Sequence, residues 1–288
     1  MLPHEWVNST QVFTHNVPGS PYVCIRTPVI VAAGPLLLAF GEARHWYGDG
    51  CCPTAAFPVP GVCMNDTFRA QQQAARAADP CQTDVVMKLS RDFGASWSPL
   101  SVAARCLHQP AALVAHGGEV LLYVSNVSTV GPVPPGQTTA NFLVRATPSP
   151  SGALAFSAPV PVHNGTGPFV NASVPVVVNN GPGRAIQLGR AHPIAPGRIL
   201  SAGWLMPAHW PEQNQDVIVF YSDDNARTHA ASRTIVRGME ESQLVELASG
   251  EVQLFSRNRA DCIAPNGFNQ QGMCVAVTRS TDAGAVRQ

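Results

Sequence analysis

The chain has 288 residues, a formal net charge of zero at pH 7 and only 12% charged residues. A basic face for the nucleic-acid backbone needs an excess of lysine and arginine, so this composition argues against nucleic-acid binding. The length is enough for one large domain with a substantial core, and 26 prolines with 24 glycines are typical of many turns and few helices.

Paired apolar runs, each broken by a short turn, recur along the chain and predict β-hairpins. Runs of roughly four to eight apolar and β-branched residues bounded by Gly, Pro, Asn or Ser are typical of strands. No segment has an amphipathic helical period over three turns. The sequence therefore predicts an all-β fold. The paired runs are Val29–Phe40 around Gly34-Pro35, Ala111–Val124 around His116-Gly117-Gly118, Arg198–Leu205, and Gln243–Phe255 around Ser249-Gly250.

A distinctive turn motif follows the strand-like run 84–89. It reads Ser90-Arg91-Asp92-Phe93-Gly94-Ala95-Ser96-Trp97. An Asp in a tight turn accepts hydrogen bonds from backbone N–H groups a few residues on, and Gly permits the positive φ that closes the turn. The Trp ring can then fill space between neighbouring sheets. The motif predicts a structural turn without a catalytic role.

The same motif returns in altered form. The segment 222–229 keeps the Ser and the Asp but has Ala226 where Gly belongs and His229 where Trp belongs. Because Asn tolerates a left-handed conformation, we expect Asn225 to adopt it and to shift the bend. A third copy is Ser280–Gly284, and Ser149–Gly152 is a weaker echo. The four leading serines lie 59, 73 and 58 residues apart, a spacing typical of the four-stranded blades of a propeller.

These turns resemble the Asp boxes of sialidases and related β-propellers. Further segments resemble the motifs of exo-α-sialidases: Cys24–Pro28, Leu36–Arg44, Gly181–Leu188, Pro196–Leu200, Glu240–Leu247 and Leu254–Arg257. The resemblance implies a sialidase-like β-propeller with about four of six blades present, the last one incomplete. Residues 1–288 are then one domain, with blades at roughly 20–108, 109–165, 170–236 and 240–288.

The resemblance also implies an activity. Exo-α-sialidases are retaining glycoside hydrolases that remove terminal sialic acid from glycoproteins, glycolipids and oligosaccharides. They use a tyrosine nucleophile, because the sugar carries its own carboxylate and repels a carboxylate nucleophile. The alternative is a non-catalytic Asp-box propeller that binds carbohydrate or another protein. No metal or cofactor is implied, and a zinc site built from cysteines is a lesser alternative, because the chain has no C-x-x-C pair.

Two arginines are the implied ligands of the substrate carboxylate. Arg26 matches the first and Arg257 the second of three arginines that hold this group in the family, and guanidinium groups suit it because they donate paired, charge-assisted hydrogen bonds. Glu42 is implied to brace Arg26, and Arg44 to be structural.

The implied acid and base are carboxylates. Glu241 lies sixteen residues before the second arginine, as the general base does in the family, and Glu240 is its immediate rival. The acid/base residue is Asp49 when counted forward from the Leu36–Arg44 segment, and Asp79 when counted back from Ser90. The two counts differ because about thirty residues are inserted between the Leu36–Arg44 segment and Ser90. Asp79 is slightly favoured over Asp49, because the strand that follows Asp79 sets its distance to the turn at Ser90.

The family's third arginine and its tyrosine nucleophile have no match. The four tyrosines are Tyr22, Tyr47, Tyr123 and Tyr221, and none has the required position. We therefore expect the chain to stop inside the fourth of six blades.

Eight cysteines and five N-x-S/T sequons, at Asn8, Asn65, Asn126, Asn164 and Asn171, predict a secreted or secretory/lysosomal location with disulfides restraining the 50–82 loop. Against this, residues 1–16 contain no apolar core of a signal peptide. The apolar run 36–38 is too short to span a membrane. The oligomeric state is not predicted.

Overall fold

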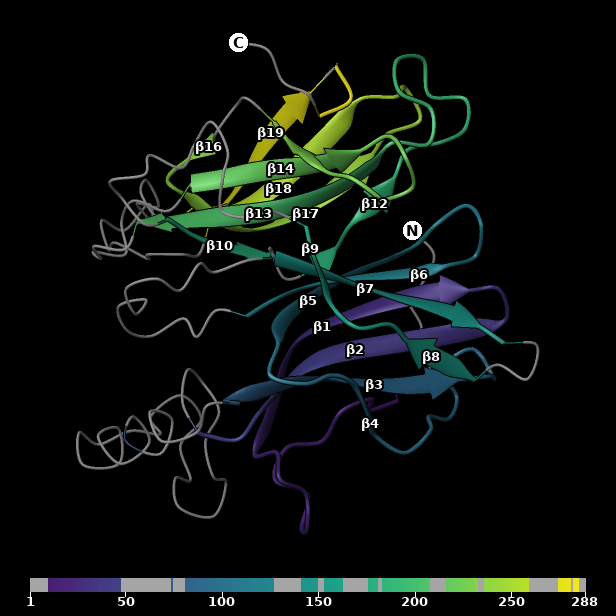
Figure 1. The fold of residues 1–288 in the computed structure, drawn as a ribbon, viewed down its shortest axis with the longest axis vertical. Coiled ribbons are helices and arrows are strands. Elements are labelled where there is room, and N and C mark those ends of the chain that lie inside the picture. The colour runs from purple at the N-terminus through teal and green to yellow at the C-terminus, as the bar shows by residue number, and fades with distance from the viewer. Residues whose placement is uncertain are drawn as a thin grey trace, which may run out of the picture.

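The computed structural model describes residues 10–47, 74, 81–126, 141–149, 153–162, 176–180, 183–207, 216–232, 236–258, 274–280 and 282–284. Within them the chain forms four sheets, stacked along the long axis of Figure 1 with the first sheet at the bottom and the third and fourth at the top. We call the sheets blades 1 to 4. The prediction of an all-β, four-bladed propeller arrangement is confirmed.

Blades 1 and 2 are meanders of antiparallel strands. Blade 1 contains β1 (Cys24–Ala33), β2 (Leu36–Arg44), β3 (Thr83–Ser90) and β4 (Ser101–Ala104), paired in that order. Blade 2 contains β5 (His108–Val114), β6 (Val120–Ser125), β7 (Asn141–Pro148), β8 (Leu154–Phe156) and β9 (Val160–Pro161). The short strand β11 (Gly183–Arg184) joins blade 2 by pairing in parallel with β5.

Blades 3 and 4 follow the same plan. Blade 3 contains β10 (Val176–Asn180), β12 (Ile186–Gln187), β13 (Ile199–Pro207), β14 (Asp216–Ser222), β15 (Ala230–Ala231) and β16 (Val236–Arg237). Blade 4 contains β17 (Met239–Glu246), β18 (Val252–Asn258) and β19 (Cys274–Ser280). The hairpins predicted at Gly34-Pro35, His116–Gly118 and Ser249-Gly250 are confirmed as β1–β2, β5–β6 and β17–β18. The run 198–205 is not a hairpin, because it forms the single strand β13.

Apolar side chains fill the space between successive blades. Leu38 and Phe40 of blade 1 belong to one buried cluster with Leu122 and Val124 of blade 2. A second cluster joins blade 2 to blade 3, and a third joins blade 3 to blade 4. Because both faces of a blade are covered, strands such as Val120–Ser125 are buried at every position, which explains their continuous apolar sequence.

The innermost strands start at a common end of the molecule. Glu42 at the end of β2 accepts a hydrogen bond from the backbone N–H of Gln109 at the start of β5 (3.1 Å). At the other end, Glu246 of β17 accepts one from Gly189 N–H, and Arg190 reaches the carbonyl of His116 in the β5–β6 turn. We call these the site end and the turn end. Arg26, Glu42, Glu241 and Arg257 all lie near the site end, because β1 and β17 start there and β2 and β18 finish there.

Three turns at the turn end share one hydrogen-bond pattern. In each, the Ser hydroxyl contacts the Asp carboxylate two residues on and accepts the backbone N–H four residues on: Ser90 with Asp92 and Gly94, Ser222 with Asp224 and Ala226, Ser280 with Asp282 and Gly284.

The expected shift of the second bend is wrong. Ala226 has φ of 61°, at the position that Gly94 and Gly284 occupy with φ of 92° and 78°. Asn225 is left-handed as well (φ 59°), but so is the residue before the glycine in the other two turns, Phe93 and Ala283. Ala226 is held because it is buried against blade 2 and because Arg145 of β7 donates to its carbonyl. Tertiary contacts thus override the local preference for glycine.

Candidate functional site

Strands β1, β5 and β17 lose regular pairing at the site end. Their registers shift between Arg26 and Val29, between His108 and Ala111, and between Met239 and Ser242. In β1 and β5 the irregularity contains a non-glycine residue in the left-handed region, Thr27 (φ 46°) and Gln109 (φ 50°). Bulges redirect side chains and are frequent beside functional sites, and left-handed β-branched residues are rare and strained.

Arg257, on β18, is held between two consecutive glutamates of β17. Its Nη1 lies 3.0 Å from Glu240 Oε1 and 3.1 Å from Glu241 Oε2. The Glu240 side chain is 3% exposed, whereas those of Glu241 and Arg257 are each 37% exposed. The structure thus brings together the predicted second arginine, the predicted base and its rival.

Glu42 is a buried carboxylate of the site end. Its two oxygens accept from Arg44 Nε (2.6 Å) and Gln109 N–H (3.1 Å). Burial by itself raises the pKa of Glu42, but the Arg44 charge, His108 and these two hydrogen bonds outweigh it, so the pKa is lowered. Arg26 lies directly opposite Glu42 in the β1–β2 ladder and is half-buried. The carboxylate therefore ties Arg44 and blade 2 together beside Arg26.

His108 and Gln109 are site-end residues that sequence reasoning missed. Both are buried, and the buried Gln109 Oε1 has no hydrogen-bond partner in the structure. The available sequence signal was a polar pair followed by Pro110, which has no N–H, at the start of an apolar run. Asp49 and Asp79, the two predicted acids, lie outside the described residues.

The four tyrosines are engaged elsewhere. Tyr22 donates to Asp84 (2.7 Å), Tyr47 to Asn16 (2.7 Å), and Tyr123 bonds His229 (3.0 Å). Tyr221 lies under the Arg198 guanidinium, 4.6 Å from its ring centre. Burial, and for Tyr22 the hydrogen bond to Asp84, raise the pKa of Tyr22 and Tyr123, so both stay neutral phenols.

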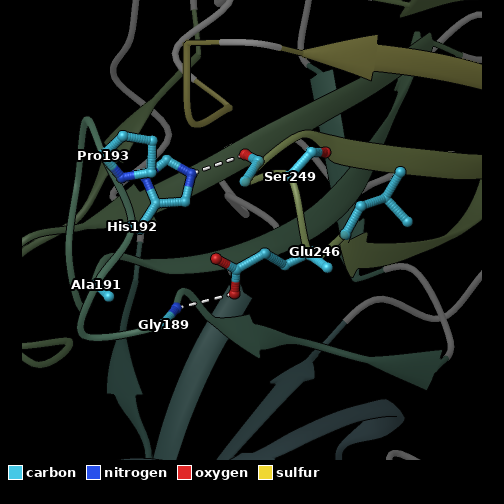
Figure 2. Close-up of a pocket in the computed structure, with 9 residues that line it drawn as sticks. Gly189, Ala191, His192, Pro193, Glu246 and Ser249 are labelled. Atoms are coloured by element: carbon cyan, nitrogen blue, oxygen red, sulfur yellow. Dashed lines mark hydrogen bonds between the residues drawn. The ribbon is translucent and has the colours of Figure 1, made fainter.

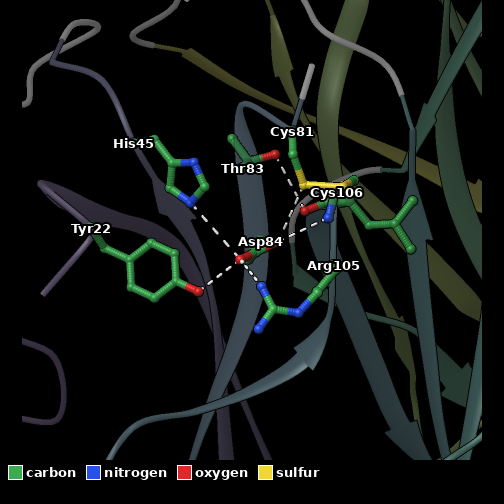
Figure 3. The surroundings of a disulfide bond; sticks show 8 residues. Tyr22, His45, Cys81, Thr83, Asp84, Arg105 and Cys106 are labelled. Atoms are coloured by element: carbon green, nitrogen blue, oxygen red, sulfur yellow. Dashed lines mark hydrogen bonds and ion pairs between the residues drawn. A yellow bond between two sulfur atoms is a disulfide. The ribbon is translucent and has the colours of Figure 1, made fainter. Parts of the chain in front are cut away.

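A disulfide fixes the base of the loop that contains the predicted acids. Cys81 bonds Cys106, joining the start of β3 to the connection before β5 (Figure 3). Buried Asp84 beside it accepts from Tyr22 and from Cys106 N–H, with Arg105 and His45 at 3.7 and 3.8 Å. Cys81 thus forms a disulfide, as predicted, whereas Cys51, Cys52 and Cys63 lie outside the described residues. Cys24 is also disulfide-bonded.

A pocket of about 360 Å³ lies at the turn end, away from these residues. It separates the 189–193 loop of blade 3 from the β17–β18 turn (Figure 2). His192 Nδ1 accepts from the backbone N–H groups of Ile194 and Ala195, so its Nε2–H donates to the Gly250 carbonyl (2.8 Å). This histidine clamps two blades, and its bonds are those of a structural residue.

No known family model matches the chain, and no curated protein matches it in sequence. Solved sialidase structures do share its fold. Trypanosoma rangeli sialidase with 2,3-difluorosialic acid matches at a TM-score of 0.61 and 14% identity, over 91% of this chain and 36% of its own. The Hadza microbial sialidase Hz136 matches at 0.61 and 16%, over 92% and 46%. A leech intramolecular trans-sialidase with 2,7-anhydro-Neu5Ac matches at 0.61 and 10%, over 97% and 52%.

The chain thus has the fold of sialidases and spans between 36% and 52% of the length of these three structures. At such identities the likeness concerns the fold. Within the described residues no helix is both long and apolar enough to cross a membrane.

Proposed function

We propose that this chain is part of an exo-α-sialidase-like glycoside hydrolase site that binds the terminal sialic acid of glycoconjugates. The observation that carries the proposal is Arg257 held by Glu240 and Glu241 at the site end, the end at which β1 with Arg26 also begins. Two guanidinium groups provide paired donors for one carboxylate, and an adjacent glutamate provides a base.

In this proposal each group has a separate role. Arg26 and Arg257 hold the sugar carboxylate, Glu241 accepts the proton of a phenol nucleophile, and Asp49 or Asp79 protonates the departing oxygen. Glu42 orients Arg44 and the start of β5 beside Arg26. Both arginines can bind the carboxylate only if their guanidinium groups lie within about 12 Å of each other. This is roughly the largest separation at which two guanidinium groups can contact one small ligand.

A second candidate is a propeller that binds carbohydrate without turnover. It is favoured by one observation, that Tyr22, Tyr47 and Tyr123 are hydrogen-bonded away from Glu241 and Tyr221 packs under Arg198. Among residues 1–288, no tyrosine is then placed to act as the nucleophile beside this base.

Two measurements on the 288-residue chain test the binding that both functions require and the turnover that only the first requires. Binding of N-acetylneuraminic acid, followed by ligand-observed NMR, is expected for the wild type and is lost in Arg26→Ala and Arg257→Ala. Hydrolysis of a fluorogenic sialoside is expected not to exceed that of Glu241→Ala. Absence of binding contradicts both functions. Robust Glu241-dependent hydrolysis contradicts the second candidate and means that another residue is the nucleophile.

We also propose a secretory location, supported by the Cys81–Cys106 disulfide and the disulfide-bonded Cys24. Asn126, the sequon asparagine within the described residues, is exposed at the end of β6. Expression through the secretory pathway is expected to give a glycosidase-sensitive mass shift that Asn126→Gln reduces by one glycan. An unmodified Asn126 in a secreted, oxidised chain contradicts its use as an acceptor.

A further inference from the structure

Glu240 and Glu241 are consecutive, yet both carboxylates reach the same nitrogen of Arg257. In a regular strand neighbouring side chains point to opposite faces of the sheet, so only one of them could do this. The register shift between Met239 and Ser242 removes that alternation. The bulge is held by the Ser242 hydroxyl, which donates to the Glu240 carbonyl and contacts the Ser256 hydroxyl at 2.8 Å.

The two ion pairs differ in burial, and therefore in what breaking them costs. Glu240 is 3% exposed, and a buried carboxylate is strongly destabilised when its cationic partner leaves. Glu241 is 37% exposed, and an ion pair open to water contributes little and is readily exchanged. The ion pair of Arg257 with Glu240 is therefore costly to break, whereas its ion pair with Glu241 can be exchanged.

The charges around Arg257 also indicate that the contact with Glu241 is the one that can be exchanged. Arg257 already lies between two acidic side chains before any ligand binds. A ligand carboxylate that joined this group without any change would meet two like charges at short range, which is unfavourable. Glu241 can avoid this by turning toward solvent, whereas buried Glu240 has no such freedom.

We propose that Glu240 is a positioning residue: it holds Arg257 in place before a ligand arrives and leaves Glu241 able to exchange its contact with Arg257 for a ligand carboxylate. The inference rests on the proposed function for the role of Arg257, but the order of the two ion pairs does not.

The test compares Glu240→Gln with Glu241→Gln and uses Glu251→Gln, at the turn end, as the matched control. The first readout needs no ligand: the ¹⁵N guanidinium resonances of Arg257, assigned with Arg257→Lys, report how strongly rotation about the bond to Nη1 is hindered. Hindered rotation is expected to survive in Glu241→Gln and in the control, and to be lost in Glu240→Gln. If Glu240→Gln does not fold, Glu240→Asp, which keeps the charge but withdraws it by one carbon, is expected to show the same loss.

The second readout is the dissociation constant of N-acetylneuraminic acid. Loss of the fixed geometry is expected to weaken binding about tenfold in Glu240→Gln, the equivalent of one charge-assisted hydrogen bond, and to leave Glu241→Gln equal to or tighter than wild type. The reverse NMR pattern, with rotation freed only in Glu241→Gln, overturns the positioning role. The expected NMR pattern without any sugar binding leaves that role intact and contradicts the proposed function instead.

Discussion

At the scale of single residues, the site end concentrates buried charge that the fold must compensate. Glu42 is fully enclosed, with its oxygens on Arg44 and Gln109 N–H. Replacing one member of a buried ion pair leaves the other uncompensated. The stability of blade 1 therefore depends on this carboxylate, apart from any role in ligand binding.

Glu42→Gln is expected to lower the free energy of unfolding by about 3 kcal/mol, because the amide cannot neutralise Arg44. Its matched control is Glu119→Gln, which removes the more exposed pair with Arg145 and is expected to cost about 1 kcal/mol. Urea denaturation at pH 7 gives both values. Equal losses of unfolding free energy in the two variants would show that the burial of Glu42 does not increase the contribution of its ion pair to stability.

His229 makes stability depend on pH. Burial lowers its pKa from 6.5 to about 4, despite the opposing charge of Asp224, and its Nε2 lies 3.0 Å from the Tyr123 hydroxyl. The folded state thus prefers the neutral ring. Its contribution is fully present above pH 6.5 and is lost as the pH falls toward 4. The full shift is equivalent to about 3 kcal/mol, and partial exposure reduces it to about 1 to 2 kcal/mol.

Comparison with His229→Phe isolates this contribution. Between pH 7 and pH 4, the wild type is expected to lose about 1 to 2 kcal/mol more than the variant, which has no titrating group there. Urea unfolding followed by fluorescence across this range measures the difference. Parallel pH profiles for the two proteins would rule out His229 as the source.

At the scale of elements, the turns of one blade are fastened to the strands of the preceding one. Arg145 of β7 donates to the carbonyls of Asn225 and Ala226 in the blade 3 turn. Arg198, just before β13, pairs with Asp223 and donates to the carbonyl of Ala283 in the blade 4 turn. Left-handed residues can stay in these turns because neighbouring elements hold their backbone.

Gly284→Ala tests this packing. Gly284 has φ of 78°, and a Cβ there would lie 3.0 and 3.2 Å from the Leu200 methyl groups. Strain and overlap together are expected to cost about 2 kcal/mol. Gly117→Ala, in open space without positive φ, is expected to change stability by less than about 0.5 kcal/mol. Thermal unfolding of both variants measures these changes in stability. If Gly284→Ala is as stable as the wild type, the turn can move away from Leu200.

At the scale of the whole molecule, three interfaces join four blades, and one face of blade 4 takes no part in them. Leu244 and Leu254 pack against blade 3, so the alternate positions of β17 and β18 face the other way. On that side Val245, Val275 and Val277 are exposed. An exposed apolar sheet face favours association between molecules.

The double substitution Val275→Lys, Val277→Lys is expected to suppress concentration-dependent self-association by placing two charges on this face. Val160→Lys, at a similarly exposed valine of β9, is the control and should leave association unchanged. Sedimentation velocity over a range of concentrations makes the comparison. If the double variant associates as strongly as the wild type, the surface responsible for self-association lies elsewhere.

The sequence by itself determined the all-β class, the hairpins and the position of the turns, because these depend on patterns within a few residues. Strands show as apolar runs, and the serine, aspartate and glycine of a turn act on each other directly. The resemblance also selected Glu240, Glu241 and Arg257 as one group, since they lie on adjacent strands of a single hairpin.

Only the tertiary structure decided what depends on neighbouring blades. Ala226 keeps its left-handed conformation because Arg145 and blade 2 hold it, where local preference had pointed to a shifted bend. Glu42 contacts Gln109, 67 residues away, which no local pattern reports. The order of the two glutamates at Arg257 depends on a bulge and on burial, and burial is set by packing between blades rather than by the residues themselves.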